Sequence, residues 1–262
     1  VTGVQTCALP IWPLARGFGE LLPGAAWWTF GLAVYAAAMI AVAALMLDLL
    51  ATAPALERVF RTIVPGIDLA TTAGLLQYSF VDLGCILVGL AVATFLSTAW
   101  GDETGSRLES LLATPLSRVR WLLAATGACL AALALVTGTL GLTIGAGVAA
   151  SGEAASDAAA GSLVLGVYGI ALVGIGMAAG GLFGGGTAAP VAAGVAILTF
   201  LLDTFAPMLR LPAWLSQLAI TSHLGEPLVG RADLTGIALC LAIGLAGIAV
   251  GTWRIARRDL AG

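Results

Sequence analysis

Asp82 and Asp203 are acidic residues that stand inside long apolar runs of the sequence. An ionisable group at the centre of a membrane helix costs about 2.5–3.5 kcal/mol to insert, so its presence is a default indication of function. Such carboxylates could line a translocation path that selects cationic or polar substrates. The alternative is hydrogen-bonded helix packing, or contact with water at the outer end of each helix.

Groups that could support catalysis or bind a metal are sparse in this chain. His223 is its only histidine, and no GxSxG or HExxH motif occurs. The sequence has no lysine, which excludes the GxxxxGK[ST] phosphate-binding loop and ATP hydrolysis through it. The cysteines (Cys7, Cys85, Cys129 and Cys240) form no CxxC or Cys/His cluster. We therefore expect no catalytic residue, no metal site, no cofactor and no enzyme activity.

Residues 101–121 are the most charged stretch of the chain. Asp102 and Glu103 stand at its start, where carboxylates favour the positive end of a helix dipole. Three leucines follow at helical spacing and give the segment one apolar stripe: Leu108, Leu111 and Leu112. The pattern predicts a short amphipathic helix. The alternative is an ordinary solvated loop with arginine anchors.

The end of this stretch carries signals for a new helix. Pro115 stops the amphipathic segment, because a residue that precedes proline avoids the helical region. Ser117 can then cap the next helix, and Arg118 and Arg120 can anchor the end of that helix at a membrane surface. The sequence therefore predicts a capped membrane helix that begins near residue 118.

The composition of the whole chain decides what positions these residues. The 262 residues are 60% hydrophobic and 10% charged, with a mean hydropathy of +1.05, whereas a soluble domain carries about 25% charged residues. Continuous apolar runs indicate membrane helices rather than barrel strands. Six windows are long enough to cross a bilayer, at about 26–47, 74–98, 121–149, 161–183, 188–205 and 234–253. We therefore expect an all-α, polytopic integral membrane protein with six transmembrane helices.

Arginine placement predicts the orientation. With the N-terminus inside, seven arginines lie on the cytoplasmic side: Arg16, Arg107, Arg118, Arg120, Arg254, Arg257 and Arg258. Four lie outside: Arg58, Arg61, Arg210 and Arg231. Positive residues favour the cytoplasm, so both termini should be cytoplasmic. The net charge of −3 and the absence of a basic stripe argue against a nucleic-acid partner.

Small residues and outer loops complete this picture. Glycines four apart predict close helix contacts at Gly141/Gly145, Gly176/Gly180/Gly184 and Gly247/Gly251. The apolar residues of the outer loop 49–72 have helical spacing, which predicts a short amphipathic helix there. We expect the outer loop 206–233 to be partly re-entrant or to lie at the membrane interface. Gly174–Gly180 has the form GxGxxxG inside a span with no preceding strand, so we do not expect it to bind a nucleotide.

The first eleven residues differ from everything that follows. Val1–Ile11 resembles the conceptual translation of a common sequencing-library adapter, and such segments are excluded from fold reasoning. We therefore expect residues 1–11 to be non-native and residues 12–262 to form one six-span permease-like domain.

The charged stretch resembles a known family. From Asp102 to Trp121 it is similar to the EExxGRxExLLATPVSRxRW pattern of ABC-2 type transporter permeases, closest to the actinobacterial drug or polyketide-antibiotic exporters. Asp102 stands where the pattern has its first Glu, which keeps the charge. The end of the chain, Trp253–Leu260, and the segments Leu211–Trp214 and Thr221–His223 also resemble this family. Together the resemblance covers about residues 74–262.

This resemblance implies a function and its partners. The loop between spans two and three would be a coupling helix that docks on a separate cytoplasmic ABC ATPase, and ATP and Mg²⁺ would bind only to that partner. The residues of this stretch that would carry the coupling are Asp102, Glu103, Gly105, Arg107, Leu108, Glu109, Leu111, Leu112, Pro115, Ser117 and Arg118. Many relatives have two six-span halves, so the second half would be a homodimer partner or a missing N-terminal half.

We therefore expect the transmembrane subunit of an ATP-driven efflux transporter in a bacterial plasma membrane. It would export a hydrophobic or drug-like substrate such as an antibiotic. Two other classes stay open. One is an ion-coupled secondary transporter that uses Asp82 and Asp203, and the other is a membrane scaffold subunit with no small-molecule path.

Overall fold

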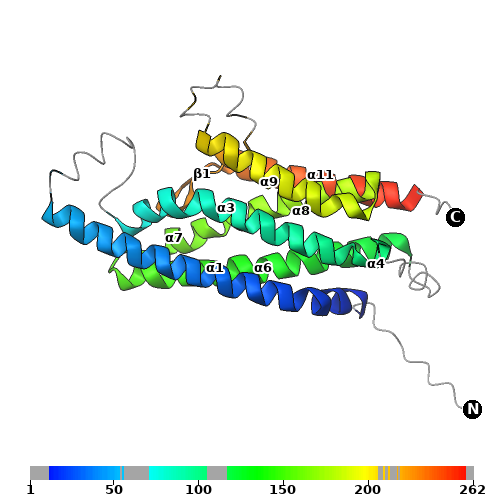
Figure 1. Ribbon diagram of the computed structural model, residues 1–262, viewed down its shortest axis with the longest axis horizontal. Helices are drawn as coiled ribbons and strands as arrows, with labels where there is room; N and C mark the ends of the chain where they lie inside the picture. Colours follow the sequence, from blue (N-terminus) through cyan, green and yellow to red (C-terminus); the bar gives the residue numbers. More distant parts are fainter. Residues whose placement is uncertain are drawn as a thin grey trace, which may run out of the picture.

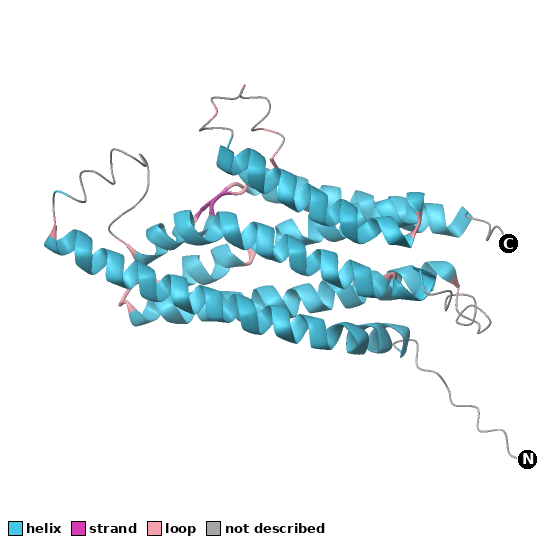
Figure 2. Cartoon of the chain, viewed as in Figure 1, coloured by secondary structure: helices cyan, strands magenta, loops and turns pink. Residues whose placement is uncertain are grey.

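The protein is an elongated helical bundle in the computed structural model (Figures 1 and 2). The structure describes residues 12–53, 55, 71–104, 117–205, 209, 212, 217 and 219–257. Its longer helices are α1 (Trp12–Thr52), α3 (Thr72–Ala99), α6 (Arg118–Ala150), α8 (Val164–Phe183), α9 (Ala188–Phe205) and α11 (Leu234–Arg257). Its shorter elements are α4 (Gly101–Thr104), α7 (Ala155–Ser162), η1 (Gly185–Thr187), η2 (Thr221–His223), η3 (Pro227–Val229), β1 (Gly225–Glu226) and β2 (Arg231–Ala232).

Helix α3 is the centre of the bundle. It contacts α1 and α6 on one side and α8 and α9 on the other, and α11 packs on α8 (Figure 1). Five described helices are long and apolar enough to cross a membrane: Pro13–Thr52, Arg118–Ala150, Ala155–Phe183, Gly185–Phe205 and Leu234–Arg257. Helix α3 adds the apolar stretch Leu83–Ala99. The prediction of an all-helical polytopic membrane protein is confirmed.

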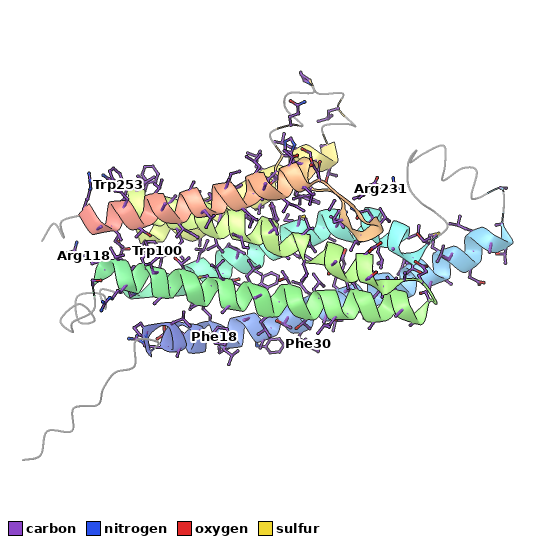
Figure 3. All side chains as sticks on the ribbon, turned by 180° about the vertical axis from the view of Figure 1, so that it is seen from behind. Phe18, Phe30, Trp100, Arg118, Arg231 and Trp253 are labelled. Atoms are coloured by element: carbon purple, nitrogen blue, oxygen red, sulfur yellow. The ribbon has the colours of Figure 1, made fainter. Side chains whose placement is uncertain are left out.

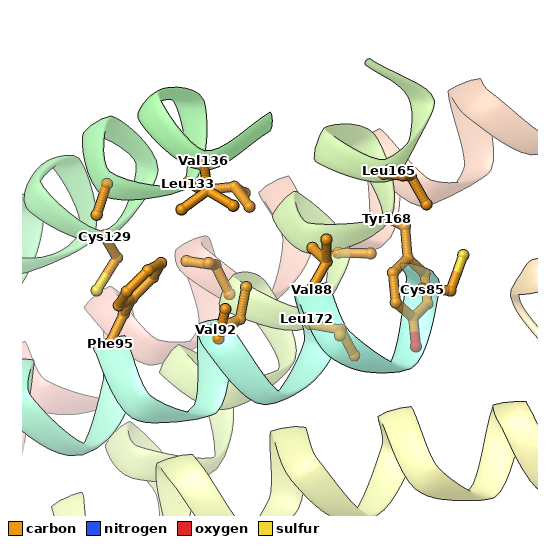
Figure 4. Packing of buried hydrophobic residues seen from close by; sticks show 14 of the residues in the cluster. Cys85, Val88, Val92, Phe95, Cys129, Leu133, Val136, Leu165, Tyr168 and Leu172 are labelled. Carbon is orange, nitrogen blue, oxygen red and sulfur yellow. The ribbon is translucent and has the colours of Figure 1, made fainter. Parts of the chain in front are cut away.

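The core lies where α3, α6 and α8 meet (Figure 4). Three helix faces contribute to it: Cys85, Val88, Val92 and Phe95 from α3, Cys129, Leu133 and Val136 from α6, and Leu165, Tyr168 and Leu172 from α8. The Tyr168 and Thr199 hydroxyls lie 3.3 Å apart, so the buried Tyr168 hydroxyl has a hydrogen-bond partner on α9. Cys85, Cys129 and Cys240 are buried thiols, which agrees with their positions in apolar runs.

Helices α8 and α11 meet at their backbones. A Cβ atom on Gly174 would lie 2.5 Å from the Gly244 Cα atom, and one on Gly181 would lie 2.7 Å from the Gly251 Cα atom. A Cβ on Gly247 would collide with the carbonyl of Gly174. We call these five glycines the α8–α11 seam. In lipid the hydrophobic effect does not drive helices together, and small residues let two helix backbones approach closely enough to pack.

The predicted glycine pairs are true contacts, although their neighbours differ. Gly247 and Gly251 belong to the seam. Gly141 and Gly145 face Ser162 and Ala159 of α7, where Cβ atoms would lie 2.9 Å from the Ser162 hydroxyl and 3.0 Å from the Ala159 Cβ. Within the third set, Gly176 faces Leu96 and Gly180 faces Trp100, whereas Gly184 ends α8 with a φ of 104°.

The first helix begins earlier than the predicted residue 26. It starts at Trp12 and continues through Pro23 for 41 residues. Arg16, Glu20 and Pro23 lower the mean hydropathy of the first turns of α1. A search for long apolar runs therefore placed the start of this helix too late. However, Arg16 Nε donates to Glu20 Oε1 at 2.9 Å. Leu21 and Ala25 are buried, so this segment joins the bundle.

The outer loop before α11 folds back on the bundle. In its described part, β1 and β2 pair antiparallel around η3, and Leu228 is buried. The Leu228 N–H donates to Gln77 Oε1 of α3 at 2.8 Å. Glu153, after α6, accepts from the Thr72 N–H at 2.7 Å and so caps the start of α3. The described residues from Ala219 to Asp233 form a folded cap, whereas most of the stretch 211–220, on which the re-entrant or interfacial prediction rests, lies outside the described residues. The amphipathic helix predicted within 49–72 falls on positions outside the described residues.

Candidate functional site

The charged stretch begins at the end of α3. The Trp100 N–H donates to the Leu96 carbonyl at 3.0 Å, and the chain continues into the single turn of α4. The Glu103 N–H donates to the Trp100 carbonyl at 3.1 Å. The Asp102 side chain and residues 105–116 lie outside the described residues. The predicted coupling residues in that range are Gly105, Arg107, Leu108, Glu109, Leu111, Leu112 and Pro115.

The stretch ends as its sequence predicts. Ser117 has the extended backbone of a helix cap, with φ −75° and ψ 149°, and its hydroxyl accepts from the Arg120 N–H at 3.3 Å. Arg118 is half-buried and Arg120 is exposed. The rings of Trp100 and Trp121 meet edge to face with centroids 5.4 Å apart. The two ends of the charged stretch are therefore held together by a tryptophan pair.

A lateral groove lies beside this junction. It has a volume of about 630 Å³ and is lined by Trp28, Leu90, Ala93, Thr94, Ser97, Trp100, Gly185, Gly186, Ala189, Pro190 and Ala193. These residues come from α1, α3, η1 and α9. The α3 part runs from Leu90 to Trp100, which is about 15 Å along a helix. The volume is that of a small-molecule site.

The groove wall is apolar with a few polar groups. The Trp28 indole N–H donates to the Thr94 hydroxyl at 2.7 Å, and that hydroxyl donates to the Ala91 carbonyl at 2.7 Å. Ser97 is exposed. None of the residues that line the groove is ionisable. Sequence analysis missed this groove, because its lining residues come from distant parts of the chain.

The structure places the two acids of the apolar runs only in part. Asp203 is half-buried near the C-terminal end of α9 and is not among the groove-lining residues. Asp82 belongs to the N-terminal half of α3, and its side chain lies outside the described part of the chain. A role for them in a translocation path stays a prediction.

The other candidate groups have ordinary partners. His223 Nε2 lies 2.8 Å from the Gln217 carbonyl in the outer loop. At the end of α11, the guanidinium carbons of Arg254 and Arg257 lie 5.9 and 4.7 Å from the Trp253 ring centroid. Among the described residues, no three His, Cys, Asp or Glu side chains come together as a metal site.

Charge is divided between the two ends of the bundle. The end that carries Trp12, α4 and Arg257 has Arg16, Arg118, Arg120, Arg254 and Arg257 against Glu20 and Glu103 among described side chains (Figures 1 and 3). At the opposite end, described side chains give Arg231 against Asp48, Glu153, Asp157, Asp203, Glu226 and Asp233. One described end of the bundle is basic and the other is acidic.

The family described as "Multidrug efflux system permease Rv1217c, C-terminal domain" matches residues 21–255. The chain belongs to this family. The match runs from the third turn of α1 almost to the end of α11, so it includes the groove, the tryptophan pair and the seam. Membership makes the chain a membrane permease of the multidrug-efflux type, which is a transport role. No curated protein matched the sequence.

Proposed function

We propose that this efflux permease is the transmembrane subunit of an ATP-driven ABC-2 type exporter. The observation that carries the proposal is the stretch from Asp102 to Trp121, which matches the ABC-2 coupling pattern except that Asp102, Ser106 and Leu116 replace its Glu, Gly and Val. Support comes from its described ends, because Trp100 and Ser117 lie at the basic end of the bundle together with Arg257. A cytoplasmic ATPase would dock there.

The proposed orientation follows from the charge division. Arginine exceeds acid at the α4 end, and acid exceeds arginine at the other end, among the described side chains. Because positive residues favour the cytoplasm, the α4 end would face the cytoplasm of a bacterial plasma membrane. Both Trp12 and Arg257 would then lie inside.

We assign the sixth membrane crossing to α3. Its 28 residues would extend about 42 Å, which exceeds the roughly 30 Å hydrocarbon thickness. Its contacts with α1, α6, α8 and α9 support a position inside the bundle rather than on a membrane surface. With six crossings, both ends of the domain lie on the same side of the membrane. This agrees with the position of Trp12 and Arg257 at the same, basic end of the bundle.

The groove is the proposed substrate site. In this orientation it begins at the cytoplasmic interface, near Trp100, and its 15 Å or so along α3 equal half the hydrocarbon thickness. Its apolar wall and few hydroxyl groups suit a hydrophobic or drug-like molecule that enters from the inner leaflet. A second permease half, from another copy or a longer chain, would face α1, α3 and α9 and complete the path.

The mechanism would couple ATP to this groove. Two ATPase subunits bind Mg²⁺-ATP, close together and displace the segment between α3 and α6 of each half. Helices α1, α3 and α9 then change their separation and open the path toward the acidic end. The residues proposed to contact the ATPase are Asp102, Glu103, Arg107 and Glu109.

Charge reversal in the coupling segment tests the proposal. A candidate ABC ATPase, chosen from adjacent reading frames by its GxxxxGK[ST] motif, is co-expressed with this chain and co-purified in detergent. We expect Glu109→Arg or Arg107→Glu to abolish ATPase recruitment without reducing membrane insertion. Arg231→Glu is the matched control, because Arg231 pairs with Glu226 at 3.1 Å in the opposite, acidic end. Normal ATPase recovery with both Glu109→Arg and Arg107→Glu would contradict the coupling assignment.

The two intramembrane acids provide a test against ion-coupled transport. We expect Asp82→Asn combined with Asp203→Asn to retain ATP-dependent efflux, because the proposed mechanism is driven by ATP and Asp203 does not line the groove. Efflux that continues without ATP and is lost in this double variant would instead indicate a secondary transporter.

A further inference from the structure

Trp100 occupies a junction at the basic end of the bundle (Figure 3). Its side chain is 1% exposed although it follows the last residue of α3 directly. Four elements meet around it, namely the end of α3, the start of α6, the end of α8 and η1. It also lines the groove. A buried ring at such a crossing can transmit a displacement from one element to another.

The neighbours of the Trp100 ring leave it little room. Trp121, in the first turns of α6, meets it edge to face at 5.4 Å between centroids. A Cβ on Gly180 would lie 2.5 Å from the Trp100 Cε2 and Cζ2 atoms, and one on Gly185 would lie 2.8 Å from Cε3. Both glycines are therefore needed for the ring to sit where it does. Close-packed contacts of this kind carry strain instead of absorbing it.

The path continues from the ring into the groove wall. Gly185 begins η1, which leads directly into α9, and Ala189 and Ala193 of α9 form the side of the groove opposite Trp28. Glu103 of α4 also reaches this turn, since a Cβ on Gly185 would lie 3.0 Å from the Glu103 Oε2 atom. The turn that leads into α9 is thus contacted by Trp100, which directly precedes the charged stretch, and by Glu103, which belongs to it.

We propose that Trp100 is a positioning residue that transmits displacement of the segment between α3 and α6 to η1 and α9, and so sets the width of the groove. The proposal rests on the exporter function given above. When an ATPase moves this segment, the ring moves with the end of α3 and with Trp121. Because its neighbours on α8 and η1 are backbone atoms, they must follow the ring.

Gly180→Ala tests this transmission without removing the ring. The added methyl group would collide with the six-membered part of the indole, so the ring must move away from its present position. Trp100→Phe shortens the side chain at this place, and the double variant Gly180→Ala/Trp100→Phe should restore the fit. Trp100→Ala is less informative, because the cavity left by a buried indole can prevent folding. Gly194→Ala is the matched control, since nothing lies within 4 Å of a Cβ at that helical position.

The readout is the groove width itself. Nitroxide labels at Ser97 of α3 and Val191 of α9, in a chain with Cys7→Ser, report the distance across the groove by pulsed electron resonance. The labelled permease is reconstituted with its ATPase, with and without Mg²⁺-ATP and vanadate. We expect a nucleotide-dependent shift in the unaltered chain and in Gly194→Ala. In Gly180→Ala the nucleotide-dependent distance shift should be lost, because the coupling between nucleotide binding and groove width becomes at least about tenfold weaker. The double variant should regain the shift.

ATPase binding and hydrolysis, measured on the same samples, separate the possible failures. The proposal requires both to be normal in Gly180→Ala. A normal distance shift in Gly180→Ala, or a lost shift that the double variant does not regain, would overturn the role of Trp100 alone. An unaltered permease that recruits no ATPase would overturn the proposed function, and the transmission proposal with it.

Discussion

The α8–α11 seam and the groove between α1, α3 and α9 are packed in opposite ways. At the seam, backbone meets backbone, and Gly174 and Gly247 have no space for a side chain. At the groove, α1 and α9 are separated by an open volume of about 630 Å³. The residues of α1 and α9 are also largely exposed, with Phe30 at 62% and Leu198 at 58%. One side of the bundle is built to stay together, and the other has room to change its separation.

Polar contacts follow the same division. At the groove face, a side-chain hydrogen bond from Trp28 to Thr94 joins α1 to α3. The acidic end is tied by several long-range bonds, including Gln77 to Leu228 and Glu153 to Thr72. A bundle tied at its acidic end and open near its basic end can vary the width of the groove without unfolding.

The largest effect is expected at the seam. Gly174→Val places a branched side chain against the backbone of Gly244, which cannot rotate away. Ordinary overpacking costs about 1–3 kcal/mol, and a collision with backbone should cost more. We expect the folded, monodisperse fraction in detergent to fall sharply. Gly31→Val on α1 is the control, because nothing lies within 4 Å of a Cβ there. Equal losses for both variants would remove the distinction between the two sides.

A smaller effect is expected in the outer cap. Gln77→Ala leaves the Leu228 N–H without its acceptor beneath a buried side chain. An unsatisfied buried donor costs about 1–3 kcal/mol. Thermal unfolding in detergent should therefore move to lower temperature. Gln217→Ala, a position described in the same outer loop, should leave the unfolding temperature unchanged, because the contact of Gln217 uses its backbone carbonyl.

Next comes the hydrogen bond across the groove. Trp28→Phe removes the indole donor to Thr94 and should cost about 0.5–1.5 kcal/mol. We expect α1 and α3 to separate more readily near the groove while the seam stays intact. Trp27→Phe is the matched control, because Trp27 is 74% exposed and its ring meets that of Phe30 edge to face on the same helix. If both variants change the stability equally, the Trp28 bond has no special part in holding the groove face.

The smallest effect is expected at the start of α6. Ser117→Ala removes the cap hydroxyl that accepts from the Arg120 N–H and should cost about 1 kcal/mol. Ser117→Asp should retain the stability of the parent chain, since aspartate also caps helices well. A loss of equal size in both variants would show that the hydroxyl acts through something other than capping.

Local features of the site were visible in the sequence, whereas neighbours in space were not. The Ser117 cap and the bounds of α9 follow from local chemistry, and both are confirmed. Gly247 and Gly251 were identified by spacing, but their contacts with Gly174 and Gly181 were missed, because spacing does not name the opposing helix. The groove was missed for the same reason, since its wall combines Trp28, Thr94 and Gly185 from distant parts of the chain.

The central claim is that the groove face changes its separation while the seam stays fixed. It is tested by two spin-label pairs in the permease reconstituted with its ATPase, one between Phe30 of α1 and Leu198 of α9, the other between Phe183 of α8 and Leu245 of α11. These side chains are exposed, at 62%, 58%, 74% and 66%. The account predicts that Mg²⁺-ATP with vanadate shifts the α1–α9 distances and leaves the α8–α11 distances unchanged. A shift at α8–α11, with α1–α9 constant, would contradict it.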